Sequence, residues 1–261
     1  MSDAHSSPYL HHHFDTLEQQ RQASSLGMWV FIAQEIMFFG GLFLAYTYYR
    51  ALYPEAFAVG SSLLSLGWGG FNTVVLICSS LTVALSVHAA QVGNKNGIMR
   101  YIVATMFLGV IFLGVKYIEY HAKFDHNLVP GRNFQFEPHD AHAHTAPVEF
   151  ELPALVASAQ AQVPQMAMPA MDGEALHAEE EHGELSFDPR HLQIFFSLYF
   201  AMTGMHALHM IIGIGLMFWL LRLAGTNRFA PEYYTPVELF GLYWHFVDII
   251  WIFLFPLLYL I

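Results

Sequence analysis

Long apolar runs separated by short polar stretches make up most of the chain. Five runs hold about 20 or more mostly apolar residues, the length that a helix needs to cross roughly 30 Å of hydrocarbon. The runs are continuous and do not alternate apolar with polar positions, which favours helices over a transmembrane barrel. We therefore predict an all-α integral membrane protein, a bundle of five transmembrane helices, with spans at about 26–49, 63–90, 99–121, 192–222 and 237–261.

Polar segments divide these spans into two groups. A polar N-terminal tail covers residues 1–25, the first three spans lie within 26–122, and the last two lie within 191–261. Residues 123–190 form a 68-residue connection with twelve acidic residues, only three Lys or Arg, and several histidines. The middle of this connection is rich in Ala, Pro and Met and has no run of membrane length. It is predicted to be a partly extended or disordered, acidic, His-rich extramembrane loop.

The amino-acid composition is typical of a membrane protein and excludes several kinds of site and partner. Hydrophobic residues make up 55% of the chain and charged residues 12%, whereas roughly a quarter of the residues in a soluble domain are charged. The net charge of −11 argues against nucleic acid as a partner. A single cysteine, Cys78, excludes an internal disulfide framework and a multi-cysteine metal site. No cleavable signal is evident, so the first span is expected to direct insertion.

The basic residues near the span ends predict an orientation. One side of the membrane collects Arg21, Lys95, Arg100, Arg222 and Arg228. The other side has Arg50 and the basic residues that flank the long loop, and long loops count little in the positive-inside rule. The N-terminus is therefore predicted inside, and the acidic loop and the C-terminus outside.

Glu35 lies in the middle of the first span and is the only acidic or basic residue between Arg21 and Arg50. A charge at the centre of a membrane helix costs roughly 2.5–3.5 kcal/mol on insertion scales. Glu35 therefore either faces a protein interior or is protonated. A proton relay, an ion site, and a lipid or subunit contact are open functional interpretations, beside a hydrogen bond to a neighbouring helix that serves packing alone.

Two histidines and a glycine share one face of the fourth span, in the stretch "TGMHALHMIIGIG". His206 and His209 are three residues apart, and Gly213 lies one turn further on. Two histidines on one helix cannot approach a haem iron from opposite sides, which excludes a bis-histidine haem within this helix. Hydrogen bonding between helices is the more frequent use of such side chains, and a shared metal ion is the alternative.

The fifth span carries Glu238, His245 and Asp248. Asp248 follows His245 by three residues, so the two side chains can touch on one helix face. The pair is interpreted as a self-satisfied structural pair or as a proton carrier. Trp244 and Trp251 are expected on the same ridge as Asp248.

Two further groups are interpreted as surface features. Lys116 and Glu119 lie three apart near the end of the third span and are predicted to form an interfacial pair with a snorkelling lysine. The loop histidines and residues 11–13 ("HHH") are ligand types for zinc or copper, but they lack regular ligand spacing. A solvated acidic surface is the simpler interpretation of the loop.

Four stretches strongly resemble subunit III of the haem–copper oxidases. They are "QEIMFFGGLFLAY" (34–46), "FNTVVLICSSLTVALSVHAA" (71–90), "AMTGMHALHMIIG" (201–213) and "YWHFVDIIWIFLFPLLY" (243–259). The resemblance extends over all five spans in order, and it fails only in the tails and the long loop. The match is to cytochrome c oxidase subunit III in its five-helix bacterial form.

The resemblance implies a subunit without catalytic residues, metal or cofactor of its own. Subunit I would bind this chain directly and, with subunit II, would hold the haems and copper. The subunit would support the stability of subunit I and its proton uptake in aerobic respiration, and it would bind structural phospholipid. Cytochrome c or a cytochrome c domain would donate electrons to the complex. The implied location is the bacterial inner membrane.

The resemblance also assigns roles to individual residues. Glu35 matches a buried carboxylate near subunit I and lipid, and Glu119 and Arg222 match positions assigned to lipid or interface contacts. The positions assigned to intramembrane polar packing are His206, His209, Glu238, His245 and Asp248. The mitochondrial-type subunit has two additional first spans, so a small partner subunit is expected to supply those helices here.

Two alternatives remain open. The equivalent subunit of a quinol oxidase, or of a nitric-oxide-reductase-associated relative, typically has five spans as well, and a subunit II without the two-cysteine copper site would identify it. A stand-alone metal or proton transporter would use the intramembrane carboxylates and the His-rich loop. That class predicts an internal repeat and interrupted helices, and the sequence has neither.

Overall fold

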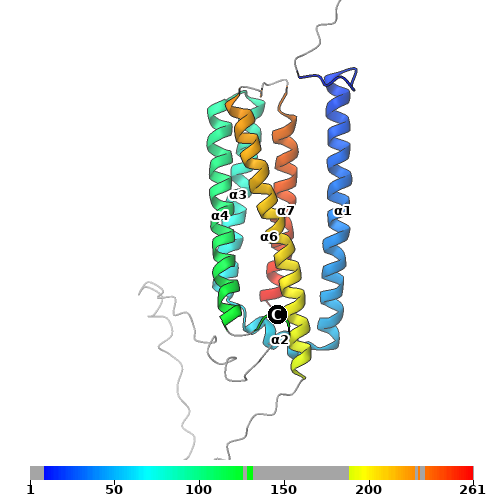
Figure 1. Ribbon diagram of the computed structural model, residues 1–261, viewed down its shortest axis with the longest axis vertical. Coiled ribbons are helices and arrows are strands. Elements are labelled where there is room, and N and C mark those ends of the chain that lie inside the picture. Colours follow the sequence, from blue (N-terminus) through cyan, green and yellow to red (C-terminus); the bar gives the residue numbers. More distant parts are fainter. Residues whose placement is uncertain (1–8, 126–127, 132–187, 227–228, 230–232, 261) are drawn as a thin grey trace, which may run out of the picture.

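The computed structural model describes residues 9–125, 128–131, 188–226, 229 and 233–260. Five long helices run side by side along the long axis of the molecule (Figure 1), and each is long and apolar enough to cross a membrane. They are α1 (Leu17–Leu52), α3 (Leu66–Gln91), α4 (Lys95–Asp125), α6 (Pro189–Gly225) and α7 (Thr235–Tyr259). The predicted all-α fold with five transmembrane helices is confirmed. The acidic loop falls almost entirely outside the described residues, so its predicted character stays a prediction.

Capping residues explain where two of the helices begin. The Thr16 side chain accepts a hydrogen bond from the backbone N–H of Gln19 at 3.1 Å, so α1 begins at Leu17, inside the predicted polar tail. Asp188 caps α6 in the same way through the N–H of Arg190 at 2.9 Å, and Pro189 occupies the first helical position. The first and fourth predicted spans are therefore shorter than the helices that contain them.

A short helix, α2 (Pro54–Ser62), follows α1 and was not predicted. It lies across the end of the bundle (Figure 1), where Phe57 is fully buried against the rings of Tyr46 and Phe195. Its nine residues are too few to register as a membrane span. α2 therefore closes one end of the bundle.

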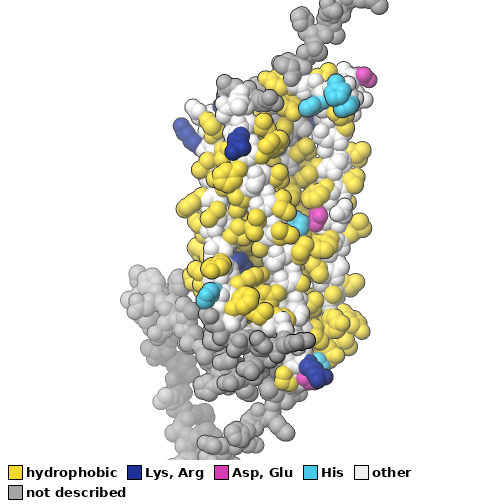
Figure 2. All heavy atoms as spheres, in the orientation of Figure 1, with side chains coloured by type: hydrophobic (Ala, Val, Ile, Leu, Met, Phe, Trp, Pro, Cys, Tyr) yellow, Lys and Arg dark blue, Asp and Glu magenta, His cyan; other side chains and the backbone are white. Residues whose placement is uncertain are grey.

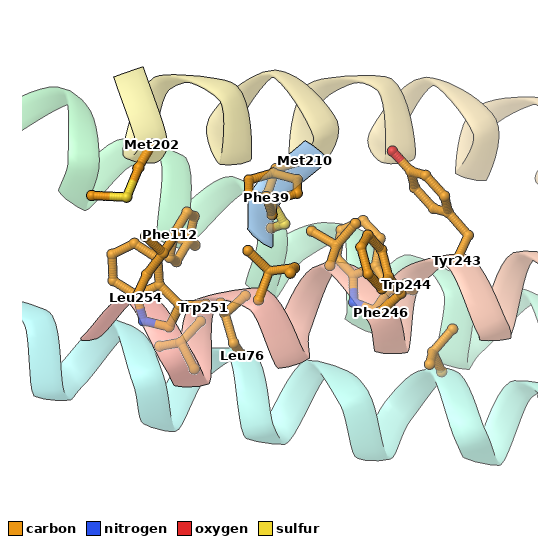
Figure 3. Packing of buried hydrophobic residues seen from close by; sticks show 14 of the residues in the cluster. Phe39, Leu76, Phe112, Met202, Met210, Tyr243, Trp244, Phe246, Trp251 and Leu254 are labelled. Carbon is orange, nitrogen blue, oxygen red and sulfur yellow. The ribbon is translucent and has the colours of Figure 1, made fainter. Parts of the chain in front are cut away.

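α7 is the central helix of the bundle and packs against α1, α3 and α6. Trp244 and Trp251 of α7 are fully buried between α3 and α6 (Figure 3). In the apolar window of α7, 56% of the residues are buried, against 17% in α1. α1 stands at one side of the bundle (Figure 1), and the face drawn in Figure 2 is mostly hydrophobic. Much apolar surface is thus left for lipid or for other chains.

The two ends of the bundle differ in what they carry. The start of α1, the turn between α3 and α4, the C-terminal end of α6 and the start of α7 lie at one end (Figure 1). α2 and the C-terminal end of α7 lie at the other. The basic side chains Arg21, Lys95 and Arg222 therefore share one end, as their positions relative to the predicted spans require.

Candidate functional site

Glu35 of α1 faces His209 of α6 across the interior of the bundle. The Glu35 Oε2 atom lies 3.2 Å from Nε2 of His209, and each side chain is 11% exposed. The other ring nitrogen, Nδ1, lies 2.8 Å from the carbonyl oxygen of Met205. A carbonyl oxygen only accepts, so Nδ1 carries a proton and donates it. The contact between Nε2 and the carboxyl group needs one further proton, because two bare acceptors would repel each other. This proton lies either on Nε2, which then faces a carboxylate, or on Glu35, which then faces a neutral imidazole.

This pair answers the question that Glu35 raises in the sequence. Phe39 packs against the His209 ring with centroids 5.4 Å apart, and Tyr243 donates a hydrogen bond to the His209 carbonyl at 2.8 Å. The carboxyl group therefore faces protein, and the His209 side chain is its partner across the contact between α1 and α6. Contact of Glu35 with lipid or with subunit I stays a prediction.

A second polar cluster lies toward the α2 end of the bundle, around Glu119. Lys116 Nζ donates to Glu119 Oε2 at 2.7 Å and to the Tyr259 hydroxyl at 2.6 Å. Tyr259 and Tyr199 donate to the other carboxylate oxygen, Oε1, at 2.6 and 3.0 Å. The ammonium group of Lys116 also lies 4.5 Å from the ring centroid of Trp251. Glu119 therefore has partners on α4, α6 and α7.

This geometry corrects the interpretation of Lys116 and Glu119 as an interfacial pair. Their side chains are 4% and 5% exposed, so the lysine does not snorkel to the surface. Aromatic residues of α6 and α7 enclose the pair. The spacing of residues within α4 gives no indication of these neighbours, because they come from other helices. Lys123, one turn further along α4, donates to the carbonyl of Leu63 at 3.1 Å and ties α4 to the end of α2.

Hydroxyl groups of α3 bind the polar residues of α7. His245 Nδ1 lies 2.7 Å from the Ser80 hydroxyl, and Asp248 Oδ2 lies 3.5 Å from the Ser79 hydroxyl. Trp244 Nε1 donates to Ser79 at 3.1 Å. No hydrogen bond or ion pair joins His245 to Asp248, so the expected pair is replaced by two bonds to α3. The serine hydroxyls were missed because serines within an apolar span carry no distinctive signal.

The remaining predicted site residues lie apart from these clusters. His206 is buried beside the rings of Phe112 and Trp251, and neither of its ring nitrogens has a hydrogen-bond partner among the described residues. Glu238 lies in the first turn of α7, and its side chain is 35% exposed and 3.8 Å from Arg21. Glu238 therefore forms an ion pair at the end of the bundle instead of packing inside it. Arg222 is exposed in the last turn of α6.

Metal ligands do not gather in the part of the chain that the structure describes. No group of three or more His, Cys, Asp or Glu side chains lies close enough there to hold an ion. His209 has one ring nitrogen engaged by a carbonyl and the other by Glu35. Because both ring nitrogens of His209 are engaged, His209 and His206 do not bind a shared metal ion in this arrangement.

Comparison with known proteins decides the family. The sequence model of "Cytochrome c oxidase subunit III" matches residues 5–127 and 181–261. The chain belongs to the cytochrome c oxidase subunit III family. The matched residues include all five transmembrane helices and every polar group described above, and they leave most of the acidic loop outside the match.

Named relatives of this subunit III chain agree over nearly its whole length. Cytochrome c oxidase subunit 3 of Corynebacterium diphtheriae is 28% identical over 91% of the chain and 87% of the relative. The probable cytochrome c oxidase subunit 3 of Mycobacterium leprae is 29% identical with the same coverage. The subunit 3 of Thermostichus vulcanus is 26% identical over 90% of the chain and 86% of the relative. The chain is thus a multi-pass membrane subunit of a haem–copper oxidase and works in a complex with other oxidase subunits.

Proposed function

We propose that this chain is the non-redox subunit III of a cytochrome c oxidase, that it packs directly on subunit I, and that it supports the stability and proton uptake of that subunit. The observation that carries the proposal is the pairing of intramembrane polar groups with each other. Glu35 binds His209, and Glu119 binds Lys116 and two tyrosines. Such groups stabilise helix packing instead of presenting a set of ligands to a cofactor. Haems and copper then belong to the partner subunits.

The proposed location is the bacterial inner membrane, with the N-terminus in the cytoplasm and the acidic loop and C-terminus outside. The basic residues at the Arg21 end of the bundle support this orientation through the positive-inside rule. At that end, the exposed Arg222 is proposed to contact lipid or a neighbouring subunit. For Glu119 we propose internal packing, because its carboxylate oxygens are occupied within the chain.

Mild detergent extraction from the native membrane tests the assignment. We expect a haem-containing subunit I and a subunit II with the two-cysteine copper site to co-purify, together with a haem signal in the reduced-minus-oxidised spectrum. A subunit II without that site would move the chain to a quinol oxidase. A colourless protein that emerges alone would contradict the proposal and make metal or proton transport the next test.

Glu35→Ala is expected to leave assembly and the initial rate of oxygen reduction nearly unchanged and to shorten the time before the oxidase inactivates. The substitution removes the partner of His209 Nε2 at the contact between α1 and α6 and so loosens the helix that has the least internal packing. The measurement is the decay of the turnover rate during continuous oxygen consumption.

Glu35→Gln is the matched control for that variant. Because His209 Nδ1 donates to the Met205 carbonyl, a neutral imidazole accepts at Nε2, and the glutamine amide can donate to it. We expect the lifetime of the glutamine variant to remain close to that of the wild type. An alanine variant with an unchanged lifetime would remove Glu35 from any protective role.

The acidic loop is proposed to attract a basic cytochrome c or cytochrome c domain by long-range electrostatics. Deletion of residues 140–185 is expected to lower steady-state turnover at low salt and to flatten its dependence on salt concentration, because most of the loop's acidic residues are removed. Equal turnover and an equal salt dependence in the deletion variant would rule out this role.

A further inference from the structure

A cavity of about 390 Å³ lies between the first turns of α1, the last turns of α6 and the first turns of α7. At the Arg21 end of the bundle its lining is partly polar and includes Glu18, Gln20 and Thr235. The lining residues farthest from that end are Met28, Leu216 and Tyr243. The Tyr243 hydroxyl group donates to the carbonyl oxygen of His209. The cavity therefore extends to the neighbourhood of the Glu35–His209 pair.

The first turns of α1 are held only weakly against the rest of the bundle. In its apolar window 17% of the residues are buried, the lowest share of the five membrane helices. Arg21 lies 3.8 Å from Glu238, but the two side chains are 49% and 35% exposed. An exposed ion pair of this kind contributes little stability. A further contact between α1 and α7 at this end therefore has a large influence on whether the cavity opens.

Residues 9–16, which precede α1, supply such a contact by joining two walls of the cavity. The backbone N–H of His11 donates to Gln20 Oε1 at 2.9 Å, and Gln20 Nε2 donates to the Tyr9 carbonyl at 3.3 Å. The Tyr9 ring stacks on the ring of Tyr233, with centroids 5.0 Å apart and planes 8° apart. Gln20 lines the cavity on α1, and Tyr233 lines it just before α7. The segment thus connects the α1 wall to the α7 wall.

We propose that residues 9–16 form a strap that holds the first turns of α1 against the start of α7 and limits the access of water to the cavity. The Gln20 hydrogen bonds fix the strap on α1, and the Tyr9–Tyr233 stack is the contact that closes it. When the stack separates, the exposed ion pair of Arg21 is left to hold the two walls together. Water then enters along the polar lining toward Tyr243. Because the strap lies within this chain, it does not depend on the proposed function.

Cysteine labelling in the intact complex tests the strap. The complex is placed in lipid nanodiscs, which leave both membrane faces in contact with water, and Cys78, the one cysteine of the chain, is replaced by serine. Ser24→Cys reports on the cavity wall. Gln22→Cys is the matched control, because Gln22 is exposed on the same turn of α1 and lies outside the lining. The measurement is the rate at which a water-soluble maleimide labels this chain.

Tyr9→Ala is expected to raise the labelling rate of Ser24→Cys roughly two- to tenfold, the effect of losing one aromatic pair. The rate of Gln22→Cys should not change. Tyr9→Phe keeps the stacked ring, so its rate should stay near that of the unaltered strap. Tyr233→Ala should match Tyr9→Ala, because both substitutions remove the same stack.

The outcomes separate the strap from general loosening of α1. Equal Ser24→Cys rates with tyrosine and with alanine at position 9 would overturn the proposal. An equal rise at Gln22→Cys would also overturn it, because the end of α1 would then be unfolding instead of moving away from α7. If Tyr233→Ala does not accumulate, the comparison of Tyr9→Ala with Tyr9→Phe decides, since Tyr9 lies outside the membrane helices. A chain that co-purifies with no oxidase subunit would refute the proposed function, and its labelling in nanodiscs would still test the strap.

Discussion

Glu119→Leu is expected to destabilise the chain by about 3–5 kcal/mol, because it leaves a buried cation without its counter-charge. The ammonium group of Lys116 would keep only the Tyr259 hydroxyl and the surrounding aromatic rings. The hydroxyl of Tyr199 would lose its acceptor at the same time. The measurement is the free energy of unfolding in mixed micelles, from a reversible denaturant titration of the variant and the wild type.

The double variant Lys116→Met with Glu119→Leu distinguishes the loss of pairing from the loss of packing. Replacing both partners of a buried ion pair by apolar residues is often neutral or stabilising, so most of the lost stability should return. Glu55→Leu serves as the control, because Glu55 is an exposed acid on α2 at the same end of the bundle. Its effect should stay within about 0.5 kcal/mol. If Glu119→Leu is as stable as the Glu55→Leu control, Glu119 does not hold the cluster together.

The five membrane helices could be predicted because length and continuity in hydrocarbon leave few alternatives. Each backbone polar group must be satisfied within its own helix, so a long apolar run specifies a spanning helix without knowledge of its neighbours. α2 was missed because its position depends on contacts with other helices. Its nine residues are held by Phe57, which packs against rings of α1 and α6, and that contact is not encoded in the local pattern.

The partners of the intramembrane polar residues could not be predicted, because they depend on how the helices are placed and rotated relative to each other. The sequence indicates that Glu35 either faces a protein interior or is protonated, but only the arrangement of α1 and α6 supplies His209. The predicted contact of His245 with Asp248 respected the geometry of one helix and failed because serines of α3 lie within reach. Spacing along one helix thus identifies candidates for polar contacts, and packing between helices selects among them.

Gly213 is the second position where a substitution is expected to have a large effect. A Cβ atom placed on Gly213 would lie 2.6 Å from Cζ3 of Trp244 and 3.2 Å from Cε1 of Tyr243. Trp244 cannot withdraw easily, because it is fully buried and its Nε1 donates to Ser79 on the far side. Only a glycine therefore lets α6 approach α7 this closely.

Gly213→Ala is accordingly expected to destabilise the chain by about 1–3 kcal/mol through overpacking, although alanine is the better helix former by about 1 kcal/mol. Gly213→Leu should be worse, because the added bulk forces α7 away from α6. Gly215→Ala is the matched control on the same helix, since a Cβ there meets nothing within 4 Å, and it should be neutral or stabilising by up to about 1 kcal/mol. The comparison is the thermal midpoint of each variant in the purified complex. A thermal midpoint of Gly213→Ala at or above that of Gly215→Ala would contradict this prediction. It would show that the α6–α7 contact can accommodate a methyl group, and that Trp244 does not limit how closely the two helices pack.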